Sequence, residues 1–334
     1  MCGIVGYTGP REAYPIIIKG LKRLEYRGYD STGVALQNGG LKVYKKKGKV
    51  AELEENIVGK DLHAHVGIGH TRWATHGEPS DRNAHPHRSS SGKLAMIHNG
   101  IIENYSQLKQ ELTKKGYAFS SETDTEVLLN FIEEIRKNNQ CDLEEAVRVA
   151  LKRVTGAYVI LLLDEDDPET IIAARKGSPL VIGIGKGEHF LGSDASPMLE
   201  YTKEVVYVND YQLAIVKADE LVLKNLGNEK ITPFVQKLDI ELVTLDRANC
   251  CGAGVIAEHN QELADTLNAR TFALAQQTDL PMMNICSTCQ GAQSECQERL
   301  DANTEYRDHV NETLALEGLH YEKGITNKHF LWLM

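Results

Sequence analysis

The residue with the clearest potential for covalent chemistry is Cys2, which becomes the N-terminal residue once Met1 is removed. Its thiol can attack an electrophilic carbon, and the free α-amine of the same residue, with an ordinary pKa of about 7.7–8.0, can carry the proton. N-terminal nucleophiles are a known variant of the triad arrangement. Because many chains begin with a small residue by chance, the interpretation depends on whether other segments supply an oxyanion hole and substrate-binding groups.

Four further segments carry such groups. Residues 27–33 (RGYDSTG) follow the first expected helix and can pack beside the N-terminus, and residues 70–77 (HTRWATHG) place an arginine, a threonine and a histidine at a strand end. Asn99 and Gly100 end another strand, where a side-chain NH₂ and an unobstructed backbone N–H form a candidate oxyanion hole. Asp124 stands near the start of a helix.

These segments, in this order and with Cys2 in front, resemble the class II (N-terminal nucleophile) glutamine amidotransferases. The sequence YRGYDS at residues 26–31 resembles the glutaminase half of glutamine:fructose-6-phosphate aminotransferase, which serves amino-sugar synthesis. The resemblance runs from Met1 to about Ala218. It implies that L-glutamine is hydrolysed to glutamate and ammonia through a γ-glutamyl thioester at Cys2, and that this reaction requires no cofactor.

The resemblance also implies a role for each site residue. Cys2 is the nucleophile, and Asn99 and Gly100 form the oxyanion hole. Arg72 binds the α-carboxylate of glutamine through a charge-assisted contact, while Asp124 receives the α-ammonium. The other substrate-binding residues, which shape the pocket or order its wall, are Arg27, Trp73, Thr75 and His76.

Each of these residues also has a structural interpretation. Asp124 could be a helix N-cap, Trp73 a core residue, and His76 and His98 structural histidines. The joint occurrence of a nucleophile, an oxyanion pair and two oppositely charged substrate-binding residues favours the functional interpretation. Four other histidines raise the question of a metal site, but we expect them in loops and the resemblance implies no metal; they are His63, His65, His85 and His87.

The order of apolar segments predicts an α+β fold for residues 1–225. Strands are expected at 4–7, 33–36, 41–44, 66–70 and 158–163, and the Asn-Gly-Gly sequence at 38–40 predicts a hairpin turn between the second and the third. Hairpins and adjacent pairs of this kind favour antiparallel sheets. A helix is expected over 14–26, and Asp142 with Glu145 resembles a capping box. The resemblance implies an N-terminal-nucleophile αββα sandwich of four layers with two antiparallel sheets.

A second domain is expected over residues 226–334, where the composition shifts. It has a strand expected at 241–245, a helix expected at 260–277, and four cysteines in CC…CxxC spacing: Cys250, Cys251, Cys286 and Cys289. This pattern resembles a fragment of the cysteine-rich (CCG) domain of heterodisulfide reductase-like proteins, and we expect a small α/β module. Soft sulfur ligands suit an iron–sulfur cluster or zinc. A further cysteine of that family pattern is missing here, and the apolar end at Met334 looks cut.

The bulk composition narrows the class of protein. The chain has 334 residues, a net charge of -10 and no basic excess that would indicate nucleic acid. It lacks a secretory signal, and its longest apolar run, 158–163, is far shorter than the ~20 residues of a membrane-spanning helix. We therefore expect a cytoplasmic protein that binds neither nucleic acid nor a membrane.

Three functions remain open. Residues 226–334 are too few for the two sugar-isomerase domains of the full aminotransferase, so we expect glutamine hydrolysis with delivery of ammonia to a separate acceptor domain or subunit. One alternative is an iron–sulfur or zinc redox subunit that uses the C-terminal cysteines. The other is a regulatory module that binds glutamine without turnover.

Overall fold

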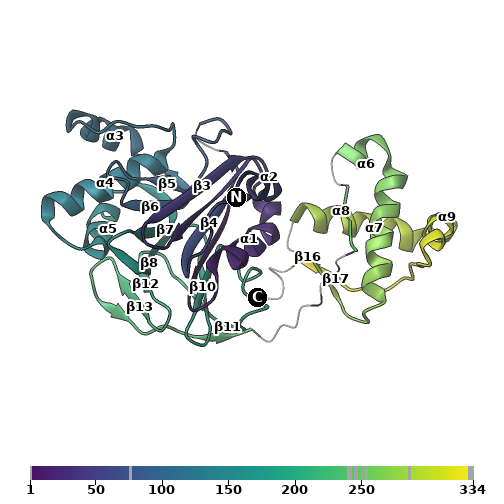
Figure 1. Ribbon diagram of the computed structural model, residues 1–334. Coiled ribbons are helices and arrows are strands. Elements are labelled where there is room, and N and C mark those ends of the chain that lie inside the picture. The colour runs from purple at the N-terminus through teal and green to yellow at the C-terminus, as the bar shows by residue number, and fades with distance from the viewer. Residues whose placement is uncertain are drawn as a thin grey trace. The chain divides into compact units, whose positions relative to one another are not determined.

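The computed structural model describes residues 2–74, 77–238, 243, 245, 247–249, 251–252, 255–284 and 287–329. The chain divides into two compact units, Met1–Ile240 and Glu241–Met334 (Figure 1). The sequence places the domain boundary earlier, at 225/226. The difference arises because two short strands beyond it, β14 (Lys230–Ile231) and β15 (Gln236–Lys237), still pair with strands of the first unit.

The first unit contains an eight-stranded sheet in the order β15-β11-β9-β10-β1-β4-β2-β3. Every described pairing in it is antiparallel. Besides β15, its strands are β1 (Gly3–Thr8), β2 (Ser31–Gln37), β3 (Leu41–Lys47), β4 (Val66–Arg72), β9 (Val181–Ile184), β10 (His189–Gly192) and β11 (Glu204–Tyr207).

A second sheet of seven strands has the order β14-β13-β12-β8-β7-β6-β5 and is also antiparallel. Besides β14, its strands are β5 (His87–Arg88), β6 (Leu94–Ile102), β7 (Gly156–Asp164), β8 (Asp167–Lys176), β12 (Gln212–Val216) and β13 (Leu221–Asn225). The strand β8 is absent from the sequence-based expectations.

The two sheets pack face to face through one buried apolar cluster. Ile4 and Ile68 of the first sheet and Ile97 and Leu161 of the second belong to it, and all four are fully buried. Helix α1 (Ala13–Arg23) packs on β1 and β4, and α4 (Asp124–Asn139) packs on β6. The other helices are α2 (Val50–Asn56), α3 (Tyr105–Lys114) and α5 (Leu143–Leu151). This helix–sheet–sheet–helix order confirms the predicted αββα sandwich (Figure 1).

Local signals explain several element ends. The β2–β3 turn uses Gly39 and Gly40 at positive φ, as the Asn-Gly-Gly sequence predicts. Asp142 caps α5 by accepting a hydrogen bond from the Glu145 N–H, as predicted. The helix expected over 14–26 ends at Arg23, and a 3₁₀ turn, η1 (Glu25–Arg27), follows and carries Arg27 to the site described below.

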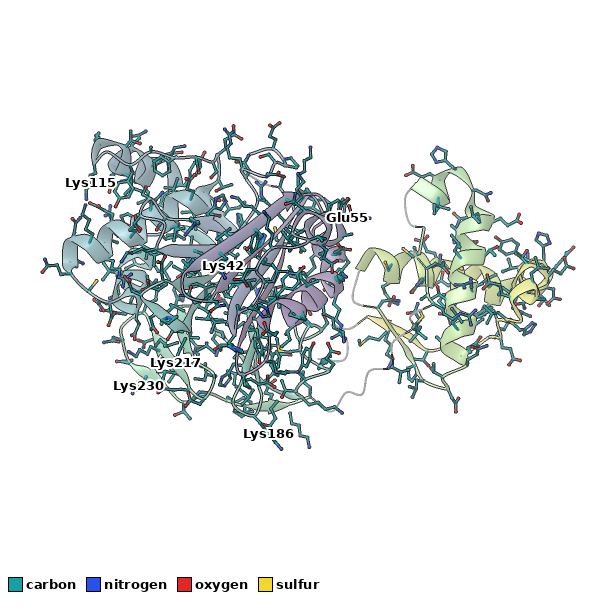
Figure 2. All side chains as sticks on the ribbon, in the orientation of Figure 1. Lys42, Glu55, Lys115, Lys186, Lys217 and Lys230 are labelled. Carbon is teal, nitrogen blue, oxygen red and sulfur yellow. The ribbon has the colours of Figure 1, made fainter. Side chains whose placement is uncertain are left out.

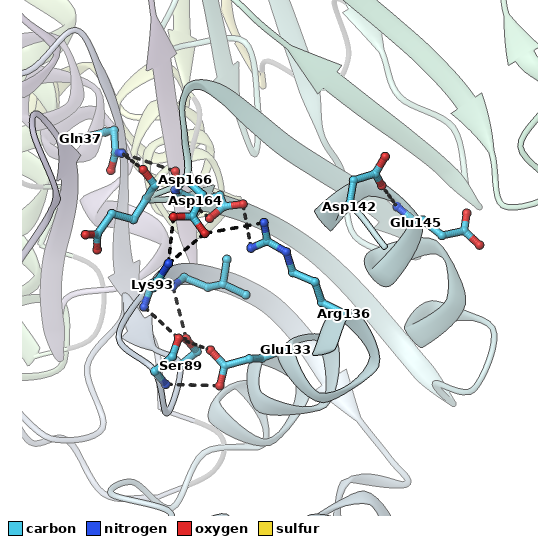
Figure 3. A network of polar contacts seen from close by, with 12 residues as sticks. Gln37, Ser89, Lys93, Glu133, Arg136, Asp142, Glu145, Asp164 and Asp166 are labelled. Atoms are coloured by element: carbon cyan, nitrogen blue, oxygen red, sulfur yellow. Dashed lines mark hydrogen bonds and ion pairs between the residues drawn. The ribbon is translucent and has the colours of Figure 1, made fainter. Parts of the chain in front are cut away.

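An ion pair joins α4 to the end of β7. Arg136 lies 2.9 Å from the Asp164 carboxylate, which is 4% exposed (Figure 3). We expect Arg136→Met to lower the free energy of unfolding by about 2 kcal/mol, because it leaves a buried carboxylate without its partner. Urea denaturation would measure this change. Lys93→Met is the matched control: it removes the neighbouring but exposed pair with Asp166 and should cost less than ~1 kcal/mol, so equal losses would contradict the prediction.

Charged side chains are dispersed over the first unit. In Figure 2, Lys115, Lys186 and Lys230 lie at separate places on its outline. Lys115 forms an ion pair with Glu134 at 2.5 Å, and Lys42 pairs with Asp61.

Within the described part of the chain, no helix combines the length and the apolar composition that a membrane crossing requires.

The second unit is a small α/β module, as predicted. A parallel pair, β16 (Met282–Asn284) and β17 (Asn327–His329), accompanies the helices. The helices are α6 (Val255–His259), α7 (Gln261–Gln276), α8 (Ser287–Ala302) and α9 (Thr304–Leu314). Its core contains Phe272, Cys296 and Tyr321, and Arg299 holds the buried Asp265 carboxylate at 2.7 Å. The predicted 260–277 helix corresponds to α7, whereas the strand expected at 241–245 lies largely outside the described residues.

Candidate functional site

A cavity of about 240 Å³ lies where β1 and α4 begin and where β4 and β6 end. Seven residues predicted from the sequence line it: Cys2, Arg27, Arg72, Trp73, Asn99, Gly100 and Asp124. Thr75 and His76 lie outside the described residues. Sequence reasoning missed six further lining residues, namely His85, His98, Ile101, Thr123, Thr125 and Ser178. The sequence analysis considers His85 only for a metal and His98 only as a structural histidine. The other four gave no signal of their own, although several directly neighbour a predicted residue.

Cys2 immediately precedes β1 and is held from several sides. Its Sγ accepts a hydrogen bond from the Trp73 N–H at 3.1 Å, and its carbonyl oxygen accepts one from Asn99 Nδ2 at 2.8 Å. The next residue, Gly3, donates its N–H to Thr71 Oγ1 at 3.2 Å. A Cβ on Gly3 would lie 2.5 Å from this hydroxyl oxygen, so only glycine allows the approach.

Burial raises the pKa of the Cys2 thiol above its ordinary value. The Trp73 N–H and Arg72 oppose this effect, and Asp30 adds to it. The net shift is upward, so the thiol is protonated at neutral pH. Attack by sulfur therefore requires a nearby base, because the thiolate is the nucleophile.

The predicted oxyanion pair lies near the end of β6. Gly100 has a φ of +128°, and a Cβ there would lie 2.1 Å from the Ala157 carbonyl oxygen of β7. No other residue fits this position without moving the strand. Asn99 is 6% exposed, and its NH₂ group has a second proton besides the one that it donates to the Cys2 carbonyl oxygen.

Two opposite charges line the cavity: Arg72 comes from a strand, and Asp124 comes from the first turn of a helix. Arg72 ends β4, is 4% exposed and donates from Nη2 to the Gly77 carbonyl oxygen at 3.1 Å. Burial lowers the pKa of its guanidinium, while Asp30 and Asp124 oppose this shift. Asp124 accepts the Ile102 N–H at 2.8 Å. The N-cap of α4 is Thr123, so the capping alternative for Asp124 is wrong.

Two further predicted residues that the structure describes, Arg27 and Trp73, also line the cavity. Arg27 lies 3.2 Å from Asp194, and the Tyr26 hydroxyl donates to the same carboxylate at 2.7 Å, which anchors the 3₁₀ turn. Trp73 is 49% exposed and stacks edge-to-face with Tyr29 at 5.5 Å. The core alternative for Trp73 is therefore wrong.

The four histidines considered for a metal separate into two pairs. His63 and His65 are exposed and contact Glu12 and the Arg11 carbonyl oxygen, respectively. His85 and His87 are buried, and His87 belongs to β5 rather than to the expected loop. Burial holds the pKa of both well below the ordinary histidine value. Among the described residues, no cluster of His, Cys, Asp or Glu could hold a metal ion.

The C-terminal cysteines are only partly described. Cys251 is buried, and its sulfur lies 3.4 Å from that of Cys289. These two sulfurs therefore converge from segments far apart in the sequence. Cys250 and Cys286, the other two members of the predicted set, lie outside the described residues.

Comparison with known proteins agrees with this geometry. A family model described as a glutamine amidotransferase domain matches residues 54–232. The chain belongs to the glutamine amidotransferase family. A second model, described as a cysteine-rich domain, matches residues 223–292 and confirms the resemblance of the C-terminal segment.

Named relatives of this glutamine amidotransferase match its first unit. Glutamine–fructose-6-phosphate aminotransferase (isomerizing) from Bacteroides thetaiotaomicron is 59% identical over 250 residues, or 74% of this chain and 41% of that protein. The Chlorobaculum tepidum protein of the same name is 55% identical over 251 residues, again 74% of this chain and 41% of the relative. The chain thus spans less than half the length of these curated relatives.

Two solved structures share the fold. One, described as the allosteric regulatory enzyme of purine biosynthesis, is 28% identical with a TM-score of 0.60 over 67% of this chain and 49% of that one. Glutamine phosphoribosylpyrophosphate amidotransferase from B. subtilis has a TM-score of 0.61 at 23% identity, over 89% of this chain and 64% of that one. Both matches agree with the N-terminal-nucleophile sandwich.

Proposed function

We propose that Cys2, freed of Met1, hydrolyses L-glutamine to glutamate and ammonia. The observation that carries the proposal is the cavity in which Cys2, Asn99, Gly100, Arg72 and Asp124 meet. A guanidinium and a carboxylate match the α-carboxylate and α-ammonium of an amino acid, while a thiol beside amide donors matches its side-chain carbonyl. Fixed charges of both signs thus orient a zwitterionic substrate toward the sulfur.

The reaction follows from these positions. The α-amine takes the proton of the Cys2 thiol as the sulfur attacks the side-chain amide carbon, and the oxyanion that forms is held by Asn99 Nδ2 and the Gly100 N–H. The carbon–nitrogen bond breaks, the amine returns its proton, and ammonia leaves. Water then adds to the γ-glutamyl thioester, and glutamate is released with the thiol restored.

Glutamate release from glutamine by the purified chain tests this proposal. We expect turnover in the chain that begins at Cys2 and none above background in Cys2→Ala. A chain that retains Met1 should also be inert, because its α-amine belongs to another residue. Mass spectrometry establishes which N-terminus is present. Full activity in Cys2→Ala, or in the chain that retains Met1, would refute the proposal.

The fate of the ammonia is a further part of the proposal. The named relatives are aminotransferases of fructose 6-phosphate, and the matched segment covers 41% of their length. We propose that ammonia made at Cys2 passes to an acceptor bound by a separate domain or subunit, with a sugar phosphate as the acceptor class. Retention of ¹⁵N from amide-labelled glutamine in a sugar product, against a background of unlabelled ammonium, would test this transfer.

A second candidate function concerns the C-terminal cysteines. The 3.4 Å separation of the Cys251 and Cys289 sulfurs fits two ligands of one soft metal, and Cys250 and Cys286 would complete the set. An iron–sulfur cluster would supply electron transfer, and zinc would supply a structural crosslink. Metal content and visible absorbance of anaerobically purified protein test this: metal lost in Cys251→Ser supports the site, whereas a metal-free wild type refutes it.

A further inference from the structure

Behind the oxyanion donor lies a histidine that the proposed mechanism does not use. His70 lies on β4, is fully buried, and places Nε2 2.9 Å from Asn99 Oδ1. Asn99 in turn donates from Nδ2 to the Cys2 carbonyl oxygen at 2.8 Å. We propose that His70 is a positioning residue that holds the Asn99 carboxamide with its NH₂ group toward the nucleophile.

The direction of each hydrogen bond follows from what the atoms can do. The Cys2 carbonyl oxygen only accepts, so the nitrogen of the Asn99 amide must face it. The amide oxygen then faces His70 and also only accepts, so His70 carries a proton on Nε2. With the amide reversed, Asn99 Oδ1 would oppose the Cys2 carbonyl oxygen and leave two acceptors in contact. His70 therefore favours one of the two amide orientations.

The protonation state of His70, and with it the Nε2–H donor, does not change over the pH range in which enzymes ordinarily work. Burial lowers the pKa of His70 to about 3, and the nearby Arg72 and His98 act in the same direction, against the Asn99 hydrogen bond. The ring of His85 packs over it with centroids 4.3 Å apart. This packing limits rotation of the His70 ring, so that Nε2 keeps its place beside the amide.

A positioning role differs measurably from a merely structural one. Hydrolysis passes through an oxyanion, whereas alkylation of Cys2 by iodoacetamide is a direct displacement that creates none. Loss of amide orientation should therefore lower kcat for glutamine while KM and the alkylation rate stay within about threefold. A general disturbance of the site would change kcat, KM and the alkylation rate together. This inference rests on the proposed glutaminase function.

Three substitutions in the full chain test it. His70→Gln places an N–H near the Nε2 position, His70→Asn is also a carboxamide but ends short of Asn99, and His70→Leu removes the donor. We expect kcat to fall about 10- to 100-fold in His70→Asn and His70→Leu and to recover at least fivefold in His70→Gln. If His70→Leu does not fold, the comparison of kcat between His70→Gln and His70→Asn still tests the proposal.

Equal kcat in His70→Gln and His70→Asn, or a parallel loss of the alkylation rate, would overturn the inference. An inert wild type would refute the proposed function instead, while an active wild type with unaffected His70 variants would refute this inference alone. Thermal unfolding of each variant identifies those whose fold is intact.

Discussion

Arg72→Met is expected to lower kcat/KM for glutamine hydrolysis about 10²- to 10³-fold, mainly through a higher KM. The guanidinium is buried at the end of β4 and is the group that we expect to bind the α-carboxylate of glutamine. Loss of a desolvated, charge-assisted contact of this kind costs roughly 3–4 kcal/mol. Methionine keeps the aliphatic stem, so the change is largely one of charge and hydrogen bonding. Initial-rate kinetics of glutamate release measure it.

A substrate analogue tests whether this loss arises from the contact with the α-carboxylate. 4-Aminobutanamide is glutamine without its α-carboxylate, so the wild type should hydrolyse it with a low kcat/KM. Arg72→Met should hydrolyse it with the same kcat/KM as the wild type. Arg82→Met is the matched control, because Arg82 pairs with Glu122 at an exposed position. It should change kcat/KM less than about twofold. A KM for glutamine that stays within threefold in Arg72→Met would contradict the assignment.

Acid is expected to destabilise the first unit strongly. His70, His85 and His87 are buried, and the pKa of each is lowered in the folded chain, to about 3 for His70. In the unfolded chain each of these histidines takes up a proton as the pH falls through about 6.5, whereas in the folded chain it stays neutral at that pH. The stability is therefore present above pH 6.5 and is lost as the pH falls below it. Three such groups lower the free energy of unfolding by about 4 kcal/mol between pH 7.5 and 5.5.

Urea denaturation at pH 7.5, 6.5 and 5.5 measures this loss. His87→Gln should reduce the dependence on pH by about a third, because one of the three groups no longer takes up a proton on unfolding. A free energy of unfolding that is constant from pH 7.5 to 5.5 would contradict the prediction.

Much of the fold is encoded in local patterns that a single sequence carries. The apolar strands β1, β4 and β7, the Gly39-Gly40 turn and the Asp142 cap lie where the sequence predicts them. Each depends on side-chain periodicity or on the backbone freedom of residues close together in the chain. By contrast, the sequence does not predict β8 or the 3₁₀ turn at Glu25–Arg27. Contacts with distant segments contribute to both, since β8 also pairs with β12 and Tyr26 donates a hydrogen bond to Asp194.

Residue types and their order along the chain predict the chemical groups at the site: a terminal thiol, a side-chain amide next to a glycine, and one charged residue of each sign. The tertiary structure determines how these groups meet, since Cys2 and Arg72 come from one sheet and Asn99 from the sheet that faces it. It also decided that His70 lies against Asn99. Hydrogen bonds across sheets depend on strand register and layer packing, which residue types and spacing do not specify.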